Sequence, residues 1–105
     1  MAVIHSDDSL FPKHLTDHSK VIVKYYADWC GSCKLFAPKY KRLSGDERFT
    51  GITFLEVNAE INPDARKLGS VNNLPSFSIF NDGKLVETQA TNKEDAVVEL
   101  LNKMM

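Results

Sequence analysis

The only two cysteines of the chain stand three residues apart, as Cys30 and Cys33. They lie in the segment Trp29-Cys30-Gly31-Ser32-Cys33-Lys34, which makes a C-x-x-C pair. This spacing suits thiol–disulfide exchange or one half of a metal site. Exchange requires a thiolate, so we expect the attacking cysteine to be exposed, with a pKa below the free value of roughly 8.5.

Three other interpretations of the pair stay open from the residues alone. The cysteines could be structural buried thiols, or the chain could be a redox-inert binding module. The pair could also form half of a zinc site with His14 and His18, which are spaced i, i+4. A zinc site needs a second ligand pair facing the first, and the sequence arranges none. We therefore expect His5, His14 and His18 to lie at the surface.

The elements around the pair favour the redox interpretation. The apolar run at residues 21–27 predicts a central strand covered on both faces. A helix should follow from residue 32 to about residue 43, kinked by Pro38. Its predicted buried face carries Cys33, Phe36, Ala37, Tyr40 and Leu43. Unpaired N–H groups at the helix start and the helix dipole can then stabilise an anion at Cys30.

This placement predicts the roles of the two thiols. We expect Cys30 to attack a substrate disulfide and to form a mixed disulfide with it. Cys33, on the apolar face of the helix, should then attack Cys30 and release the reduced substrate. No metal or prosthetic group is needed, because the two sulfurs carry both electrons.

The remaining patterns predict the element order β-α-β-α-β-α-β-β-α. Asp7, Asp8 and Ser9 supply N-cap chemistry for the first helix, and Asn62-Pro63 begins a short helix that ends at Gly69. Thr91-x-x-Glu94 predicts a capping box for the last helix. The predicted strands span residues 3–5, 21–27, 52–57, 77–80 and 84–88, with a tight turn at Asn81-Asp82-Gly83.

Length and charge narrow the class of protein. The 105 residues favour one domain spanning 1–105, and 13 basic against 14 acidic residues leave no basic stripe for nucleic acid. No stretch approaches the roughly 20 apolar residues of a membrane span, and the first eight residues lack signal-peptide features. We expect a cytoplasmic monomer with no membrane contact.

The chain resembles the thioredoxin family over essentially its whole length. The motifs that carry this resemblance are Ala27-Asp28-Trp29-Cys30-Gly31-Ser32-Cys33-Lys34, Pro38, Val57-Asn58, Asn62-Pro63, Leu74-Pro75-Ser76 and Asn81-Asp82-Gly83. The resemblance implies an α/β fold, with a central mixed five-stranded sheet in the order 1-3-2-4-5 flanked by four helices. It also implies a cis peptide between Leu74 and Pro75.

The resemblance implies an enzyme that reduces disulfides of substrate proteins and is itself reduced by a flavin-dependent thioredoxin reductase. Trp29, Gly31, Leu74, Pro75, Ala90 and Thr91 would border the docking groove, and extended substrate would pair near the backbone of Asn73 to Ser76. For Trp29 and Leu74 the alternative is ordinary packing. Two other functions remain open: a partner-binding adaptor, and a dedicated disulfide oxidant or isomerase.

Several residues depart from the family pattern. Ser32 stands where the family usually has proline. Serine restores the backbone N–H that proline lacks, and it frees the φ angle that proline fixes. Ala90-Thr91 replaces a segment that usually contains glycine. Lys24 occupies the position of a buried aspartate, and Glu56 that of its lysine partner. We expect either a charge-reversed pair beneath Cys33, with Glu56 in the proton-transfer role, or two side chains that end in solvent.

Overall fold

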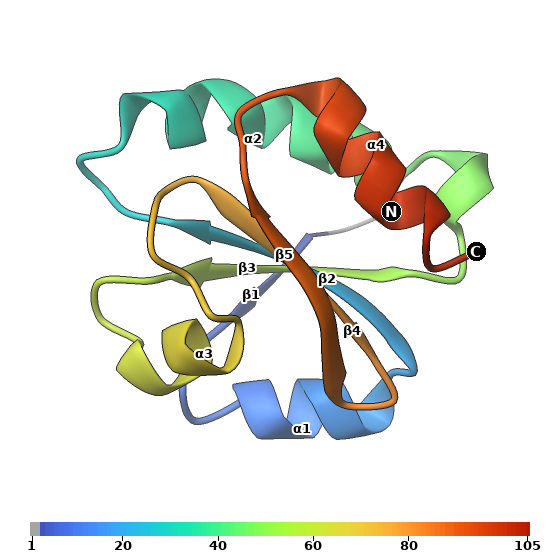
Figure 1. The fold of residues 1–105 in the computed structure, drawn as a ribbon, viewed down its shortest axis with the longest axis horizontal. Coiled ribbons are helices and arrows are strands. Elements are labelled where there is room, and N and C mark those ends of the chain that lie inside the picture. Colours follow the sequence, from blue (N-terminus) through green and yellow to red (C-terminus); the bar gives the residue numbers. More distant parts are fainter. Residues whose placement is uncertain (1–2) are drawn as a thin grey trace.

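The structure is a computed structural model that describes residues 3–105, and its centre is a five-stranded sheet (Figure 1). The strands lie in the order β1-β3-β2-β4-β5, which confirms the predicted order. β3 pairs in parallel with β1 and β2, whereas β4 is antiparallel to β2 and β5. The strands are β1 (Val3–Ser6), β2 (Lys20–Tyr26), β3 (Thr53–Asn58), β4 (Ser76–Asn81) and β5 (Lys84–Ala90).

Four α-helices cover the sheet, two on each face (Figure 1). One face carries α2 (Gly31–Ser44) and α4 (Glu94–Asn102), and the other carries α1 (Phe11–Asp17) and α3 (Pro63–Leu68). A short 3-10 helix, η1 (Glu47–Phe49), follows α2. The observed architecture is therefore the expected three-layer α/β fold, with a core on each side of the sheet.

The central strand β2 contributes to both cores, as the continuous apolar run predicts. Val21, Val23 and Tyr25 pack with residues of α1 and α3, because alternate side chains of a strand point to opposite faces. Ile22 packs in the other core with residues of α2 and α4. Lys24 has the same parity as Ile22, so this one charged residue of the buried run projects to the α2 face.

Helix α2 begins at Gly31 and is continuous past Pro38. Cys33, Phe36, Tyr40 and Leu43 are buried as predicted. Ala37 is exposed, so its placement on the buried face was wrong. Ala37 instead borders the cavity beneath Cys33, at the edge of the packed face.

The N-terminus of α3 is capped by a side chain from a distant part of the chain. Asp8 accepts hydrogen bonds from the N–H groups of Ala65 at 2.8 Å and Asp64 at 3.2 Å. Asn62 occupies the N-cap position, as predicted, but its own side chain does not cap the helix. Asp8 is thus no cap for α1, and for this residue the expectation was wrong. Asp7 does supply the expected chemistry, because its Oδ1 accepts the Leu10 N–H at 2.9 Å just before α1 begins at Phe11.

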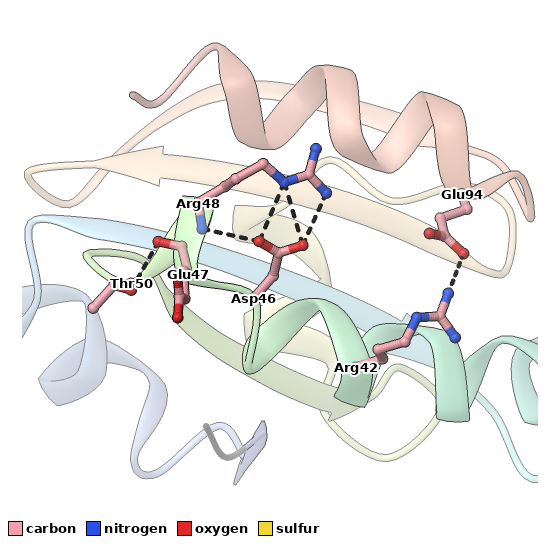
Figure 2. Close-up of polar contacts among 6 residues, drawn as sticks. All are labelled: Arg42, Asp46, Glu47, Arg48, Thr50 and Glu94. Atoms are coloured by element: carbon pink, nitrogen blue, oxygen red, sulfur yellow. Dashed lines mark hydrogen bonds and ion pairs between the residues drawn. The ribbon is translucent and has the colours of Figure 1, made fainter.

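The capping box predicted for α4 is also wrong. The helix begins at Glu94 with Lys93 as the N-cap residue, and the Lys93 N–H donates to Thr91 Oγ1 at 3.1 Å. Thr91 lies outside the helix because its own N–H donates to the Pro75 carbonyl at 3.2 Å. Glu94 instead accepts a hydrogen bond from Arg42 of α2 at 2.6 Å, which joins the two helices on this face (Figure 2).

The hairpin between β4 and β5 confirms the predicted turn. Asp82 and Gly83 both have positive φ, 52° and 82°. Two successive residues in this region make a type I′ turn, whose twist matches that of the flanking strands. The strands pair from Asn81–Lys84 onward, so β5 forms one edge of the sheet.

Candidate active site

Cys30 and Cys33 form a disulfide at the N-terminus of α2. Cys30 is the N-cap residue, with φ −85° and ψ 102°, and Cys33 lies in the first turn. The Cys33 N–H donates to Cys30 Sγ at 3.2 Å. The helix start thus directs a free backbone donor at the sulfur of Cys30, as the spacing predicts.

Both sulfur-bearing residues are almost covered in this disulfide form. Cys30 is 4% exposed and Cys33 2%, and they pack against Ala27, Tyr26 and Leu74. The expected exposure of Cys30 is therefore wrong for this form. The two cysteines therefore hardly differ in exposure. They differ in backbone position, because Cys30 is the N-cap residue of α2 and its sulfur accepts an N–H from the first turn of the helix, whereas Cys33 lies within that turn.

A cavity of about 230 Å³ lies beside Cys33, on the α2 face of the sheet. It is lined by side chains of β2, β3, the loop before Cys30 and α2. Four of the lining residues carry charge, two lysines and two acids, which balance. The lining consists of Lys24, Tyr26, Ala27, Asp28, Cys33, Lys34, Ala37 and Glu56.

Lys24 and Glu56 form an ion pair in this cavity, with Lys24 Nζ 3.7 Å from Glu56 Oε2. The sheet brings them together, because the two are register partners on β2 and β3. The Lys24 side chain is only 4% exposed and that of Glu56 31%. The alternative in which both side chains end in solvent is therefore wrong.

Lys24 is held in a mixed apolar and aromatic environment. Its Nζ lies 5.6 Å from the centre of the Tyr26 ring and 5.5 Å from that of Tyr40, within range of cation–π attraction. Burial lowers the pKa of Lys24, and the negative charge of Glu56 opposes this effect. Burial also raises the pKa of Tyr40, whose hydroxyl donates to the Leu55 carbonyl at 2.8 Å.

His5 also contacts Glu56, on the side away from Lys24 in the strand order, and this contact was not predicted from the sequence. Its Nδ1 lies 3.7 Å from Glu56 Oε1, and the two residues are register partners on β1 and β3. The side chain is 59% exposed, so the predicted surface position of His5 is confirmed. The signal that could have found the contact is the sheet order itself, which places β1 beside β3.

A second hollow, of about 250 Å³, is bordered by Leu74, which packs against the disulfide, and by Ser32 between the two cysteines. It is lined by Ser32, Leu74, Pro75, Ala90, Thr91 and Asn92. The Leu74–Pro75 peptide is cis, as the resemblance implied. The structure thus brings four of the predicted docking residues together around this hollow, which we call the docking groove, and adds Ser32 and Asn92.

The other predicted docking residues lie outside this groove. Trp29 is 67% exposed, so ordinary packing does not account for it. Asn73 lines a separate hollow, although Ala90 borders both. Gly31 is exposed, and a Cβ at this position would have no atom within 4 Å. A side chain at Gly31 would therefore project into open space.

The zinc interpretation finds no geometric support. Within residues 3–105 no group of three His, Cys, Asp or Glu side chains is placed to hold a metal ion. His14 and His18 are half-buried rather than exposed, and His14 Nδ1 is hydrogen-bonded to Ser6 Oγ at 2.8 Å. In the same part of the chain, no helix combines the length and apolar character needed to cross a membrane.

Comparison with known proteins identifies the family. The profile described as thioredoxin matches residues 2–103, so the chain belongs to the thioredoxin family. Together with the Cys30–Cys33 disulfide, this supports thiol–disulfide oxidoreductase activity.

Individual relatives cover several kinds of thioredoxin-fold protein. Thioredoxin 1 of Plasmodium falciparum is 26% identical over 98% of this chain and 97% of its own length. A solved structure of Plasmodium falciparum thioredoxin has a TM-score of 0.89 and 25% identity, covering 98% and 100% of the two chains. A putative protein disulfide-isomerase of Schizosaccharomyces pombe is 30% identical over 87% of this chain. This chain spans only 19% of that longer protein.

Proposed function

We propose that this protein reduces disulfides of substrate proteins in the cytoplasm, acting as a single-domain monomer that a flavin-dependent reductase returns to the dithiol form. The observation that carries the proposal is the Cys30 sulfur at a helix N-cap, accepting the Cys33 N–H at 3.2 Å beside an open groove. A thiolate formed there is stabilised by the helix start. The groove offers room for an extended segment of substrate.

The reaction begins from the dithiol form. The Cys30 thiolate attacks one sulfur of the substrate disulfide, forming a new S–S bond while the substrate's second sulfur leaves as a thiolate. Cys33 then loses its proton and attacks Cys30 Sγ. The bond between Cys30 and the substrate breaks, the substrate gains two electrons in total, and the Cys30–Cys33 disulfide remains.

The proton of Cys33 has an acceptor in the same cavity. Glu56 lines the cavity together with Cys33, and its 31% exposure lets it exchange a proton with solvent. Lys24, with its Nζ 3.7 Å from Glu56 Oε2, is the counter-charge of this carboxylate. Glu56→Gln should therefore slow the resolution step and change its pH dependence. An unchanged pH–rate profile would remove Glu56 from proton transfer.

Trapping tests the assignment of the two thiols. Cys33→Ser should accumulate mixed disulfides through Cys30, because the resolving thiol is gone. Cys30→Ser is the matched control and should trap far less. If Cys33→Ser captures no substrate while Cys30 remains open to alkylation, the assignment is wrong.

A second candidate, a disulfide oxidant or isomerase, is favoured by the 30% identity to the putative isomerase of Schizosaccharomyces pombe. The reduction potential of the Cys30–Cys33 pair separates the two directions. A potential near roughly −270 mV fits a reductase, and one near roughly −180 to −120 mV fits an isomerase or oxidant. Reduction of insulin with a dithiol donor tests the adaptor alternative, which requires no turnover.

A further inference from the structure

The side chain of Ser32 contacts the sulfur that is expected to attack. Ser32 occupies the second position of α2, and its Oγ lies 3.7 Å from Cys30 Sγ. A sulfur in a disulfide has no proton to give, so in this form the hydroxyl is the donor. Ser32 is half-buried and also lines the docking groove, which places its hydroxyl at the boundary between the disulfide and the substrate.

We propose that Ser32 stabilises the Cys30 thiolate by donating its hydroxyl hydrogen to Sγ, and that it thereby shifts the dithiol–disulfide equilibrium of the pair towards the dithiol. The thiolate then has two donors from the first turn of α2, the Ser32 hydroxyl and the Cys33 N–H. This inference rests on the redox activity of the pair, and holds whether the protein acts as reductase, oxidant or isomerase.

The direction of the shift follows from charge. A hydrogen bond to an ionised acceptor is roughly twice as strong as one between neutral groups. The same hydroxyl therefore stabilises the anionic Cys30 of the dithiol form more than it stabilises the neutral disulfide. The expected consequences are a lower pKa of Cys30 and a less negative reduction potential.

The same contact also acts in the resolution step. When Cys33 attacks the mixed disulfide, Cys30 is the leaving thiol, and a leaving thiol of lower pKa departs faster. Proline at this position would remove both the hydroxyl and the N–H of residue 32. Compared with proline, Ser32 thus provides a hydroxyl donor in contact with the reacting sulfur of Cys30.

Charged groups near the two cysteines also influence the Cys30 pKa and the reduction potential, and their influence must be distinguished from that of Ser32. Those lining the cavity beside Cys33 are Lys24, Asp28, Lys34 and Glu56. All four remain in place when Ser32 is changed, so their influence cancels when variants are compared at the same pH.

The test compares Ser32→Ala, which removes the hydroxyl alone, with Ser32→Thr, which keeps it. Ser19→Ala is the matched control, because Ser19 is exposed and precedes β2 at the end remote from Cys30. The thiolate absorbance of the reduced protein against pH gives the Cys30 pKa. Equilibration with a reference dithiol gives the reduction potential.

Ser32→Ala should raise the Cys30 pKa by about half to one unit. At a pH above that pKa, the equilibrium constant should move threefold to tenfold towards the disulfide, about 15–30 mV more negative. Ser32→Thr and Ser19→Ala should stay within about twofold of the parent protein. The potential difference should vanish at a pH where Cys30 is protonated in every variant.

Three results would overturn the proposal. The first is a Ser32→Ala protein whose pKa and potential match those of the parent. The second is a Ser32→Thr protein that behaves as Ser32→Ala does, since the hydroxyl would then not be the cause. The third is a potential difference that persists unchanged below the Cys30 pKa, which would place the effect in the disulfide form.

Discussion

The substitution Glu56→Gln should destabilise the fold, because it leaves the Lys24 ammonium buried without its counter-charge. The two charges lie 3.7 Å apart, which corresponds to about 4 kcal/mol at an effective dielectric constant of about 20. Glu56 is 31% exposed, so solvent screens part of this attraction. We expect a loss of about 1–3 kcal/mol in the free energy of unfolding at neutral pH.

The pH dependence gives this prediction its distinctive form. Burial lowers the pKa of Lys24 from the ordinary value of 10.5, so between the lowered value and 10.5 the unfolded chain binds more protons than the folded one. The free energy of unfolding therefore rises with pH across this window. Removing the Glu56 charge lowers the Lys24 pKa further. The loss of unfolding free energy in Glu56→Gln should thus be full at pH values below the Lys24 pKa of both the folded parent and the folded variant. It should shrink as Lys24 loses its proton at higher pH.

Urea unfolding at a series of pH values measures this effect. The series should stop near pH 10, because the buried phenols of Tyr25 and Tyr40 have raised pKa values and destabilise the fold once the unfolded chain ionises. The matched control is the double variant Lys24→Met/Glu56→Gln. Because it has no ammonium at position 24, its free energy of unfolding should not rise with pH across this window. A Glu56→Gln protein with full stability at neutral pH, or with a defect that stays constant with pH, would refute the reasoning.

Three further substitutions test the fold. Asp8→Ala removes the cap of α3 and should cost about 1–2 kcal/mol in urea unfolding, and an unchanged midpoint would contradict the capping role. Gly69→Ala would place a Cβ 2.5 Å from the Tyr25 hydroxyl oxygen, so thermal unfolding should show a loss of about 1–3 kcal/mol. Arg42→Ala breaks the pair with Glu94, but with the Arg42 side chain 64% exposed the change should stay within about 0.5 kcal/mol, and a larger, salt-insensitive loss would count against this.

The sequence was most informative where structure depends on neighbouring residues. The turn at Asp82 and Gly83 follows from residues that tolerate positive φ, and the structure has both angles positive. The helix start at Cys30 likewise follows from the apolar periodicity of the segment after it. Such features need only a few consecutive residues to be specified, so local patterns suffice to predict them.

The features that were mispredicted depend on residues far apart in the chain. Asp8 caps α3 although it precedes Ala65 by 57 residues. Thr91 matched a capping-box pattern, but its N–H is held by the Pro75 carbonyl, and α4 begins two residues beyond Asn92. In each case a tertiary hydrogen bond satisfies the backbone group that the local pattern assigned elsewhere.

The candidate site shows the same division. The C-x-x-C pair and the helix beneath it were predictable, whereas the nearly complete burial of Cys30 was not. That burial comes from Leu74 and Tyr26, which reach the disulfide from the loop before β4 and from the end of β2. The sequence alone does not specify how closely these segments approach one another.

The sheet register explains why Lys24 and Glu56 must be considered together. As partners on β2 and β3 they share one face, which places the two side chains to form the ion pair. Their burial is unequal, at 4% and 31% exposure. The member that reaches solvent can pass a proton outward, and the buried member can only set the local charge. The register therefore places the two side chains to pair, and their unequal depth supports the proposal that Glu56 exchanges the proton while Lys24 balances its charge.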